Sequence, residues 1–324
     1  MVAMRSILKA LFLVLFLVLL AFAGEFVVTE ILDDSLTLNS SDPSNSVVYI
    51  QNGVSGAVTI KDPSTSIPIT LNINYLLGSG SGVIVSKDGY IITAFHVVSD
   101  PQTLQNQLKL KRMSEEDINH YIMQAAVTEY VRYNPQLARE FNNNGDLTNF
   151  FIQNNLIRVD SARQDIKVKL ASSSPISNYL NVQLVDTGNP DIDEDIALLK
   201  LNYRSDLPSL SISSSNLVGE SIRVYGYPGN GSRTSLSLES SKGSIIRRVI
   251  NIGGVTFYET SAPASRGYSG GPALDEKNRI LGIIVYSIQS RGNNRSQTGT
   301  NSVFLSSNNL IQICKKNNVT INIS

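Results

Sequence analysis

In GSGSGVIVSKDGYIITAFHVV, residues 78–98, short apolar runs rich in Val, Ile and Tyr are separated by Gly, Asp and Ser. The same spacing recurs from about Ser46 onward, for example in NVQLVDTG, DIALLKL, SIRVYGYPG and RILGIIVYSI. Closely spaced short strands with turn signals are typical of an all-β barrel or sandwich. The leading GSGSG lacks the G-x-G-x-x-G spacing and runs into a strand, so we expect close backbone packing there rather than a phosphate site.

Composition excludes several classes of protein. The chain has 324 residues, of which 42% are hydrophobic, enough for one large domain or two small ones. Lys+Arg and Asp+Glu are both 27, so no net field favours nucleic acid, and we expect no nucleic-acid partner. Cys314 is the single cysteine, which excludes an intrachain disulfide and predicts a buried apolar residue. We expect no metal and no cofactor.

One stretch breaks the β pattern, from about residue 101 to 157. SEEDINHYIMQAAVTEYVRY carries a capping box, Ser114 with Asp117, and apolar positions at helical spacing. Asn134-Pro135 predicts the start of a second helix, and Asp146 predicts the cap of a third. We interpret the stretch as a helical insertion that serves as a lid, a partner surface or an oligomerisation element, or that simply packs on the barrel.

The N-terminus resembles a secretory signal. Arg5 and Lys9 precede the apolar run ALFLVLFLVLLAFA, which ends in the A-x-A pattern Ala21-Phe22-Ala23. This pattern predicts a signal peptide over residues 1–23 and a secreted or surface location; the alternative is an uncleaved membrane anchor over residues 7–23. Five N-x-[ST] acceptors agree with an exported glycoprotein, although they are weak support in an Asn- and Ser-rich chain.

GYSGGP, residues 267–272, is either a tight turn or a nucleophile loop around Ser269. The two histidines, His96 and His120, both precede Ser269. The nucleophile elbow of α/β-hydrolases needs its histidine after the serine, so that class is excluded. The order Asp, His, Ser of subtilisin needs an α/β scaffold that the strand-rich second half does not offer. The order His, Asp, Ser remains.

The segment GYIITAFHVV places His96 at a strand end, where catalytic groups are commonly displayed. His120 lies in the expected helix without zinc spacing, so we expect an ordinary, partly exposed residue. In DIDEDIALLKL, Asp195 directly precedes a buried strand and is our candidate for the acid. A calcium loop starting at Asp191 is disfavoured, because Ile196 stands where such a loop needs glycine.

These motifs together resemble trypsin-like serine proteases of the chymotrypsin fold, and among them the HtrA (DegP-like) branch. The resemblance covers about residues 45–100 and 164–315 and rests on three motifs in the right order. It implies two six-stranded antiparallel β-barrels, with His96 and Asp195 in the first, Ser269 in the second and the site in the cleft between them. It also implies a serine endopeptidase that acts on polypeptides.

The resemblance extends to the details of the site. It implies an oxyanion hole built from the N–H groups of Gly267 and Ser269. The base of the substrate pocket falls at Pro263 and its wall at Ile283, Ile284 and Val285; none is acidic, so we expect cleavage after aliphatic or small apolar residues rather than Lys or Arg. Two departures from the family pattern are Phe95 before the histidine and Tyr268 before the serine. The residues after Phe304 predict one helix, about 306–318, and leave no room for a PDZ domain.

The expected organisation is a lead-in at 24–45 and a protease domain at 46–324. The first barrel covers about 46–205 and the second, with the C-terminal helix, about 206–318. The competing function is a secreted or surface-tethered binding or chaperone-like protein on the same fold, with the insertion as its interaction surface. Oligomeric state and natural substrate stay open.

Overall fold

The computed structural model describes residues 42–324 except 106–108, 140, 142, 171–177, 204–205, 230–235, 252 and 290–299. The expected signal or anchor at 1–23, and most of the expected lead-in, lie outside the described residues. So do three of the five N-x-[ST] acceptors, at Asn39, Asn230 and Asn294. Within the part of the chain that the structure describes, no helix is long and apolar enough to cross a membrane.

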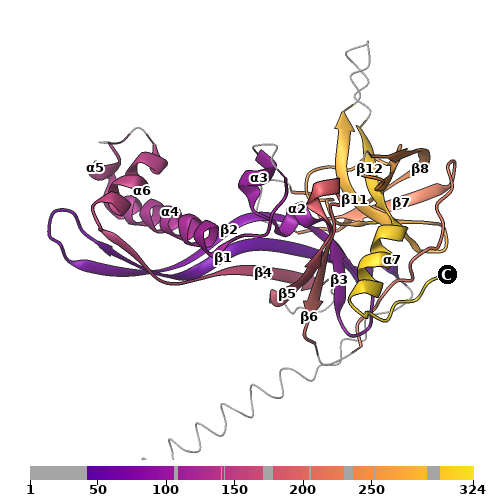
Figure 1. The fold of residues 1–324 in the computed structure, drawn as a ribbon, viewed down its shortest axis with the longest axis horizontal. Helices are drawn as coiled ribbons and strands as arrows, with labels where there is room; N and C mark the ends of the chain where they lie inside the picture. The colour runs from indigo at the N-terminus through magenta and orange to yellow at the C-terminus, as the bar shows by residue number, and fades with distance from the viewer. Residues whose placement is uncertain are drawn as a thin grey trace, which may run out of the picture. The chain divides into compact units, whose positions relative to one another are not determined.

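The fold consists of two closed six-stranded antiparallel barrels, as predicted (Figure 1). In the first the strand order is β1-β2-β3-β6-β5-β4, and the strands are β1 (Val47–Lys61), β2 (Pro68–Ile84), β3 (Tyr90–Thr93), β4 (Ile157–Leu170), β5 (Leu180–Thr187) and β6 (Ala197–Leu201). In the second the order is β10-β11-β12-β9-β8-β7, and the strands are β7 (Ser221–Gly226), β8 (Glu239–Ile250), β9 (Thr256–Thr260), β10 (Pro272–Leu274), β11 (Ile280–Gln289) and β12 (Thr300–Ser306).

The buried side chains explain why the short apolar runs become barrel strands. In β6 the residues Ala197, Leu198 and Leu199 are all fully buried, so both faces of this strand lie in the core. One apolar cluster includes residues of both barrels, and a second lies in the second barrel. Fully burying one such aliphatic side chain stabilises the fold by about 1.5–3 kcal/mol, so the two barrels depend on each other's packing.

Three strands of the first barrel continue beyond it. β2 pairs with β3 only at Val83 and Ile84, and β4 pairs with β5 only at Lys167 and Val168, whereas β1 pairs with both β2 and β4 over most of its length. Residues 53–61, 68–76 and 157–165 therefore form a three-stranded sheet outside the barrel, here called the strand extension. The strand spacing in the sequence did not predict it.

The predicted helical insertion covers the strand extension (Figure 1). Its helices are α3 (Pro101–Gln105), α4 (Glu115–Tyr133), α5 (Pro135–Ala138) and α6 (Asn144–Gln153). Buried residues of α4 and α6, such as Ile122 and Phe151, share an apolar core with Val54 and Ile73 of the extension. Of the roles left open for the insertion, packing on the first barrel's own strands is therefore observed.

The caps of these helices follow the sequence with one exception. The capping box of α4 is formed as predicted, with Ser114 and Asp117 each accepting from the other's backbone N–H. For α6 the prediction was wrong: Asn143 is the cap, and its Oδ1 accepts the N–H of Asp146 at 2.9 Å. Asp146 lies in the first turn instead, where a carboxylate also favours the helix N-terminus.

The remaining helices are short. They are η1 (Pro43–Ser46), α2 (Phe95–Val98), η2 (Pro190–Ile192) and α7 (Ser307–Lys316). α7 confirms the predicted C-terminal helix and begins after Ser306, whose hydroxyl accepts the N–H of Asn308. Cys314 on this helix is fully buried, and burial raises the pKa of its thiol to about 12, so it is the packed, unreactive residue that the sequence predicted.

Candidate active site

The register of two neighbouring strands brings His96 and Asp195 together. β3 and β6 are antiparallel and pair Thr93 with Ala197. His96 follows this pair by three residues on the one-turn helix α2, and Asp195 precedes it by two residues, so both leave the barrel at the same edge. The two strand ends that the sequence predicted for His96 and Asp195 therefore lie next to each other in the structure.

Asp195 holds His96 through both carboxylate oxygens. Oδ1 accepts the backbone N–H of His96 at 2.9 Å, and Oδ2 lies 2.6 Å from the imidazole Nδ1. The side chains are only 13% and 17% exposed, so solvent screens the pair weakly. Two contacts to one carboxylate fix the ring plane and direct Nε2 away from Asp195.

The charge of Asp195 sets the protonation of the imidazole. Burial is the largest single effect on the pKa of His96 and lowers it. The negative charge of Asp195 and its hydrogen bond act in the opposite direction, and together they raise the pKa of His96 above its ordinary value of 6.5. The imidazole therefore accepts a proton more readily than a free histidine does.

Ser269 lies in a tight loop between β9 and β10. The N–H of Tyr268 donates to the carbonyl of Ser265 at 3.1 Å, and the N–H of Gly271 donates to the carbonyl of Tyr268 at 2.8 Å. Gly267 has a φ of +96°, in the region that L side chains rarely adopt. Neither the N–H of Gly267 nor that of Ser269 donates a hydrogen bond to another described residue. The two predicted oxyanion donors are therefore not used within the described fold.

Ser81 on β2 connects this loop to the first barrel. Its N–H donates to the carbonyl of Ser269 at 2.8 Å, and its hydroxyl donates to the carbonyl of Gly267 at 2.6 Å. The same hydroxyl accepts the N–H of Tyr227 at 2.9 Å. Sequence analysis missed this role, because it explained GSGSG by close packing alone and Ser81 is 186 residues away from Gly267 in the chain.

Contacts around Gly80 place Ser269 beside helix α2. A Cβ at Gly80 would lie 2.9 Å from the carbonyl oxygen of Ser269 and 2.7 Å from Cγ2 of Val97, the neighbour of His96. Between the described residues, no hydrogen bond joins the Ser269 hydroxyl to the imidazole of His96. In proteases without substrate such bonds are often long and tighten when substrate binds.

Tyr268, the unusual residue before the serine, is an apolar anchor. Its side chain is only 4% exposed and belongs to the second barrel's core. Gly226, the last residue of β7, makes room for it, since a Cβ there would approach the Tyr268 ring to 2.6 Å. The aromatic ring thus fixes the chain next to Ser269 by packing rather than by polar contacts.

The predicted substrate pocket has an exposed base and a buried wall. Pro263 is exposed, and its carbonyl accepts from the hydroxyl of Ser241. Ile283, Ile284 and Val285 are each at most 5% exposed and lie in the barrel cores. The pairing of β11 with β12 has a β-bulge between Ile284 and Tyr286. After this bulge, Tyr286 and Ser287 are exposed.

Two other predicted residues lie apart from this site. His120 is a partly exposed residue of α4 near Gln124, as predicted. Asp191 is exposed, and its carboxylate forms an ion pair with Lys109 at 2.8 Å.

Comparison with known proteins identifies the class. A family model for the trypsin-like peptidase domain matches residues 80–283, so the chain belongs to that family. A similar protein is a probable periplasmic serine endoprotease DegP-like from Pseudomonas fulva (strain 12-X), 26% identical over 207 residues. The match covers 63% of this chain and 28% of the length of that relative. The chain therefore contains a trypsin-like peptidase domain and is similar to an HtrA-like (DegP-like) protease, which confirms the family resemblance inferred from the motifs.

Proposed function

We propose that the chain is an exported serine endopeptidase in which His96, Asp195 and Ser269 form the catalytic triad. The observation that carries the proposal is the double contact of Asp195 with His96, at 2.9 and 2.6 Å. A binding or chaperone-like surface has no need of a buried imidazole held by a carboxylate, so this contact favours the enzyme over the alternative.

In this mechanism Ser269 Oγ attacks the carbonyl carbon of the scissile peptide while His96 takes the hydroxyl proton at Nε2. Asp195 keeps the Nδ1 proton in place and stabilises the imidazolium that forms. The N–H groups of Gly267 and Ser269 donate to the oxyanion, each contributing about 3 kcal/mol to transition-state stabilisation. His96 then protonates the leaving amine, and water repeats the sequence on the acyl-enzyme.

The residue before the cut would bind beside Pro263 and Val285, with the exposed Tyr286 and Ser287 as the accessible part of the wall. The Ser287 hydroxyl donates to the carbonyl of Ala264 at 2.8 Å, which ties β11 to the segment that contains Pro263. No acidic residue belongs to this set, which supports cleavage after aliphatic or small apolar residues.

Export is supported by the sequence of residues 1–23 and by the relative, whose name describes it as periplasmic. N-terminal sequencing of the exported protein distinguishes cleavage after Ala23 from retention of an anchor over residues 7–23.

A serine-directed fluorophosphonate probe tests the triad. We expect covalent labelling of the wild-type protein and none of Ser269→Ala, because the probe reacts only with an activated serine. Ser265→Ala removes an exposed hydroxyl from the same loop and is the matched control, which should label normally. Absence of labelling in the wild-type protein, with folding intact, would contradict the proposal.

The raised pKa of His96 predicts the pH profile. The base must be neutral to take the serine proton, so kcat/KM should rise with pH through an apparent pKa above 6.5. Measurement of kcat/KM between pH 5 and 9, on a peptide without titratable side chains, checks this result. A midpoint below 6.5 would show that burial outweighs the charge of Asp195.

A further inference from the structure

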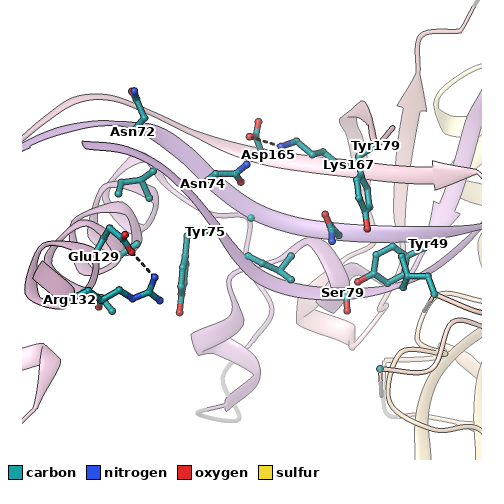
Figure 2. Close-up of a pocket in the computed structure, with 18 of the residues that line it drawn as sticks. Tyr49, Asn72, Asn74, Tyr75, Ser79, Glu129, Arg132, Asp165, Lys167 and Tyr179 are labelled. Carbon is teal, nitrogen blue, oxygen red and sulfur yellow. Dashed lines mark hydrogen bonds and ion pairs between the residues drawn. The ribbon is translucent and has the colours of Figure 1, made fainter. Parts of the chain in front are cut away.

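A groove of about 930 Å³ runs along β2 in the strand extension (Figure 2). Its lining includes Gln51, Asn72, Tyr75, Ser79, Arg132 and Lys167. These residues come from β1, β2 and β4, within the strand extension and in the adjoining part of the first barrel, and from helix α4. Nothing in the proposed mechanism uses them.

The groove encloses the edge of β2 from both faces of the sheet. Tyr75 pairs with Val54, whose side chain lies in the core under α4, so Tyr75 projects toward that helix. Figure 2 shows its ring on the same side as Arg132. Asn74 and Leu76 also line the groove, and by strand alternation they project to the opposite face. Because side chains from both faces of β2 line the groove, the backbone edge of β2 lies between them, at the centre of the groove.

Between Asn72 and Ser79, this backbone edge has no partner among the described residues. β2 pairs with β1 on one side, and on the other it pairs with β3 only at Val83 and Ile84. The N–H of Ser81 points away from β1, because it donates to the carbonyl of Ser269. Backbone groups alternate along a strand, so the N–H and carbonyl of Ser79 point the same way, into the groove. A free strand edge is a template for pairing with another extended chain.

One end of the groove lies at the nucleophile loop. Ser79 lines the groove, and the next residue, Gly80, contacts both the Ser269 carbonyl and Val97 of α2. Gly229 also lines it, and its N–H donates to the carbonyl of Arg266, the residue before Gly267. A chain that leaves the reacting bond on the side of α2 therefore enters the groove directly.

The position of the groove indicates which side of the scissile bond its occupant comes from. The residue before the cut binds beside Pro263 and Val285, and neither residue lines the groove. The leaving amine departs toward His96 on α2, the helix that Gly80 contacts. The groove therefore lies where the residues after the cut emerge.

The charges of the groove are paired. Arg132 lies 2.8 Å from Glu129, and Lys167 lies 3.3 Å from Asp165. With no excess of one sign, the groove does not select acidic or basic chains. Its amide and tyrosine side chains instead suit the backbone and mixed side chains of an extended polypeptide.

We propose that the groove binds the polypeptide segment that follows the scissile bond, in extended form, as an added strand on the free edge of β2 between Ser79 and Asn72. This inference rests on the proposed function and adds a binding surface for the substrate residues beyond the cut. A strand advances about 3.4 Å per residue, so this stretch accommodates roughly seven substrate residues.

A peptide-length series tests the inference. A peptide that the wild-type protein cleaves is shortened stepwise from nine residues to one after the cut, and a parallel series is shortened before the cut. We expect kcat/KM to fall about tenfold when the residues beyond the third after the cut are removed, as expected for the loss of several interface contacts. Equal kcat/KM across the first series would overturn the inference.

Two tyrosines provide a matched pair of variants. Tyr75 lines the groove and is 47% exposed, whereas Tyr133 is 77% exposed at the end of α4 and lies outside it. Tyr75→Ala should slow cleavage of the longest peptide while cleavage of the shortest stays unchanged, and Tyr133→Ala should change neither. Equal slowing of both peptides by Tyr75→Ala would overturn the inference.

Fluorophosphonate labelling separates the two levels of failure. A variant that labels at the wild-type rate has an intact active site, so its peptide kinetics report on the groove. Labelling and cleavage without dependence on the length after the cut would overturn the groove alone. A wild-type protein that neither labels nor cleaves any peptide would overturn the proposed function, and this inference with it.

Discussion

Asp195→Asn should lower kcat/KM at pH 7 by about 10⁴-fold, the effect typical of removing this carboxylate from a serine protease triad. The substitution keeps the size of the side chain but removes the charge beside His96 Nδ1. An amide nitrogen in that position favours the imidazole tautomer that cannot accept the serine proton at Nε2. The value of kcat/KM for a cleaved peptide and the rate of fluorophosphonate labelling should fall together.

The same variant has a second expected effect, on the pH profile. Burial lowers the pKa of His96 and the charge of Asp195 raises it, so loss of that charge should move the midpoint of kcat/KM to lower pH. Asp193→Asn is the matched control, because it removes an equal charge only two residues from Asp195. Asp193 is exposed, and asparagine tolerates its left-handed φ of 57°. If Asp193→Asn lost as much activity as Asp195→Asn, the assignment of the acid would be wrong.

Ser81→Ala should reduce both activity and stability. The hydroxyl is fully buried and satisfies two backbone groups, the carbonyl of Gly267 and the N–H of Tyr227. Each buried group left without a partner costs about 1–3 kcal/mol, so we expect the two groups together to lower the free energy of unfolding by about 2–6 kcal/mol. Because Gly267 supplies a proposed oxyanion donor, kcat should fall about a hundredfold.

Ser86→Ala separates these two effects. Ser86 is also buried and lies in the first barrel between β2 and β3, but its hydroxyl accepts only one backbone N–H, that of Tyr90, at 3.0 Å. This variant should lose stability without losing kcat. Denaturant unfolding and steady-state kinetics on both variants provide the comparison, and full kcat in Ser81→Ala would show that the oxyanion loop keeps its geometry without the hydroxyl.

Local sequence predicted the features that depend on local chemistry. The scarcity of histidine and the order of the three motifs selected His96, Asp195 and Ser269. Strand spacing predicted an all-β barrel or sandwich, and the family resemblance implied the two barrels. The helix insertion was visible because a capping box and a change of period are both encoded within a few residues.

Features that depend on distant contacts were not predictable. The bonds of Ser81 to Gly267 join positions 186 residues apart, and no spacing rule relates them. The strand extension requires the pairing of β1 with β4, which belong to either side of the insertion. On β11, the register with β12 shifts between Ile284 and Tyr286, and such a bulge leaves no periodic signal in the sequence.

The packing of the Tyr268 ring against Gly226 restricts which substitutions this chain can accept at either position. Any side chain at position 226 would occupy the space of the ring, and a smaller residue at position 268 would leave a void above the glycine. A Cβ at position 226 would also lie 2.7 Å from the Cα of Tyr268, so a smaller side chain at position 268 would not relieve the overlap. In descendants of this chain, position 226 should therefore remain glycine whichever residue stands at position 268.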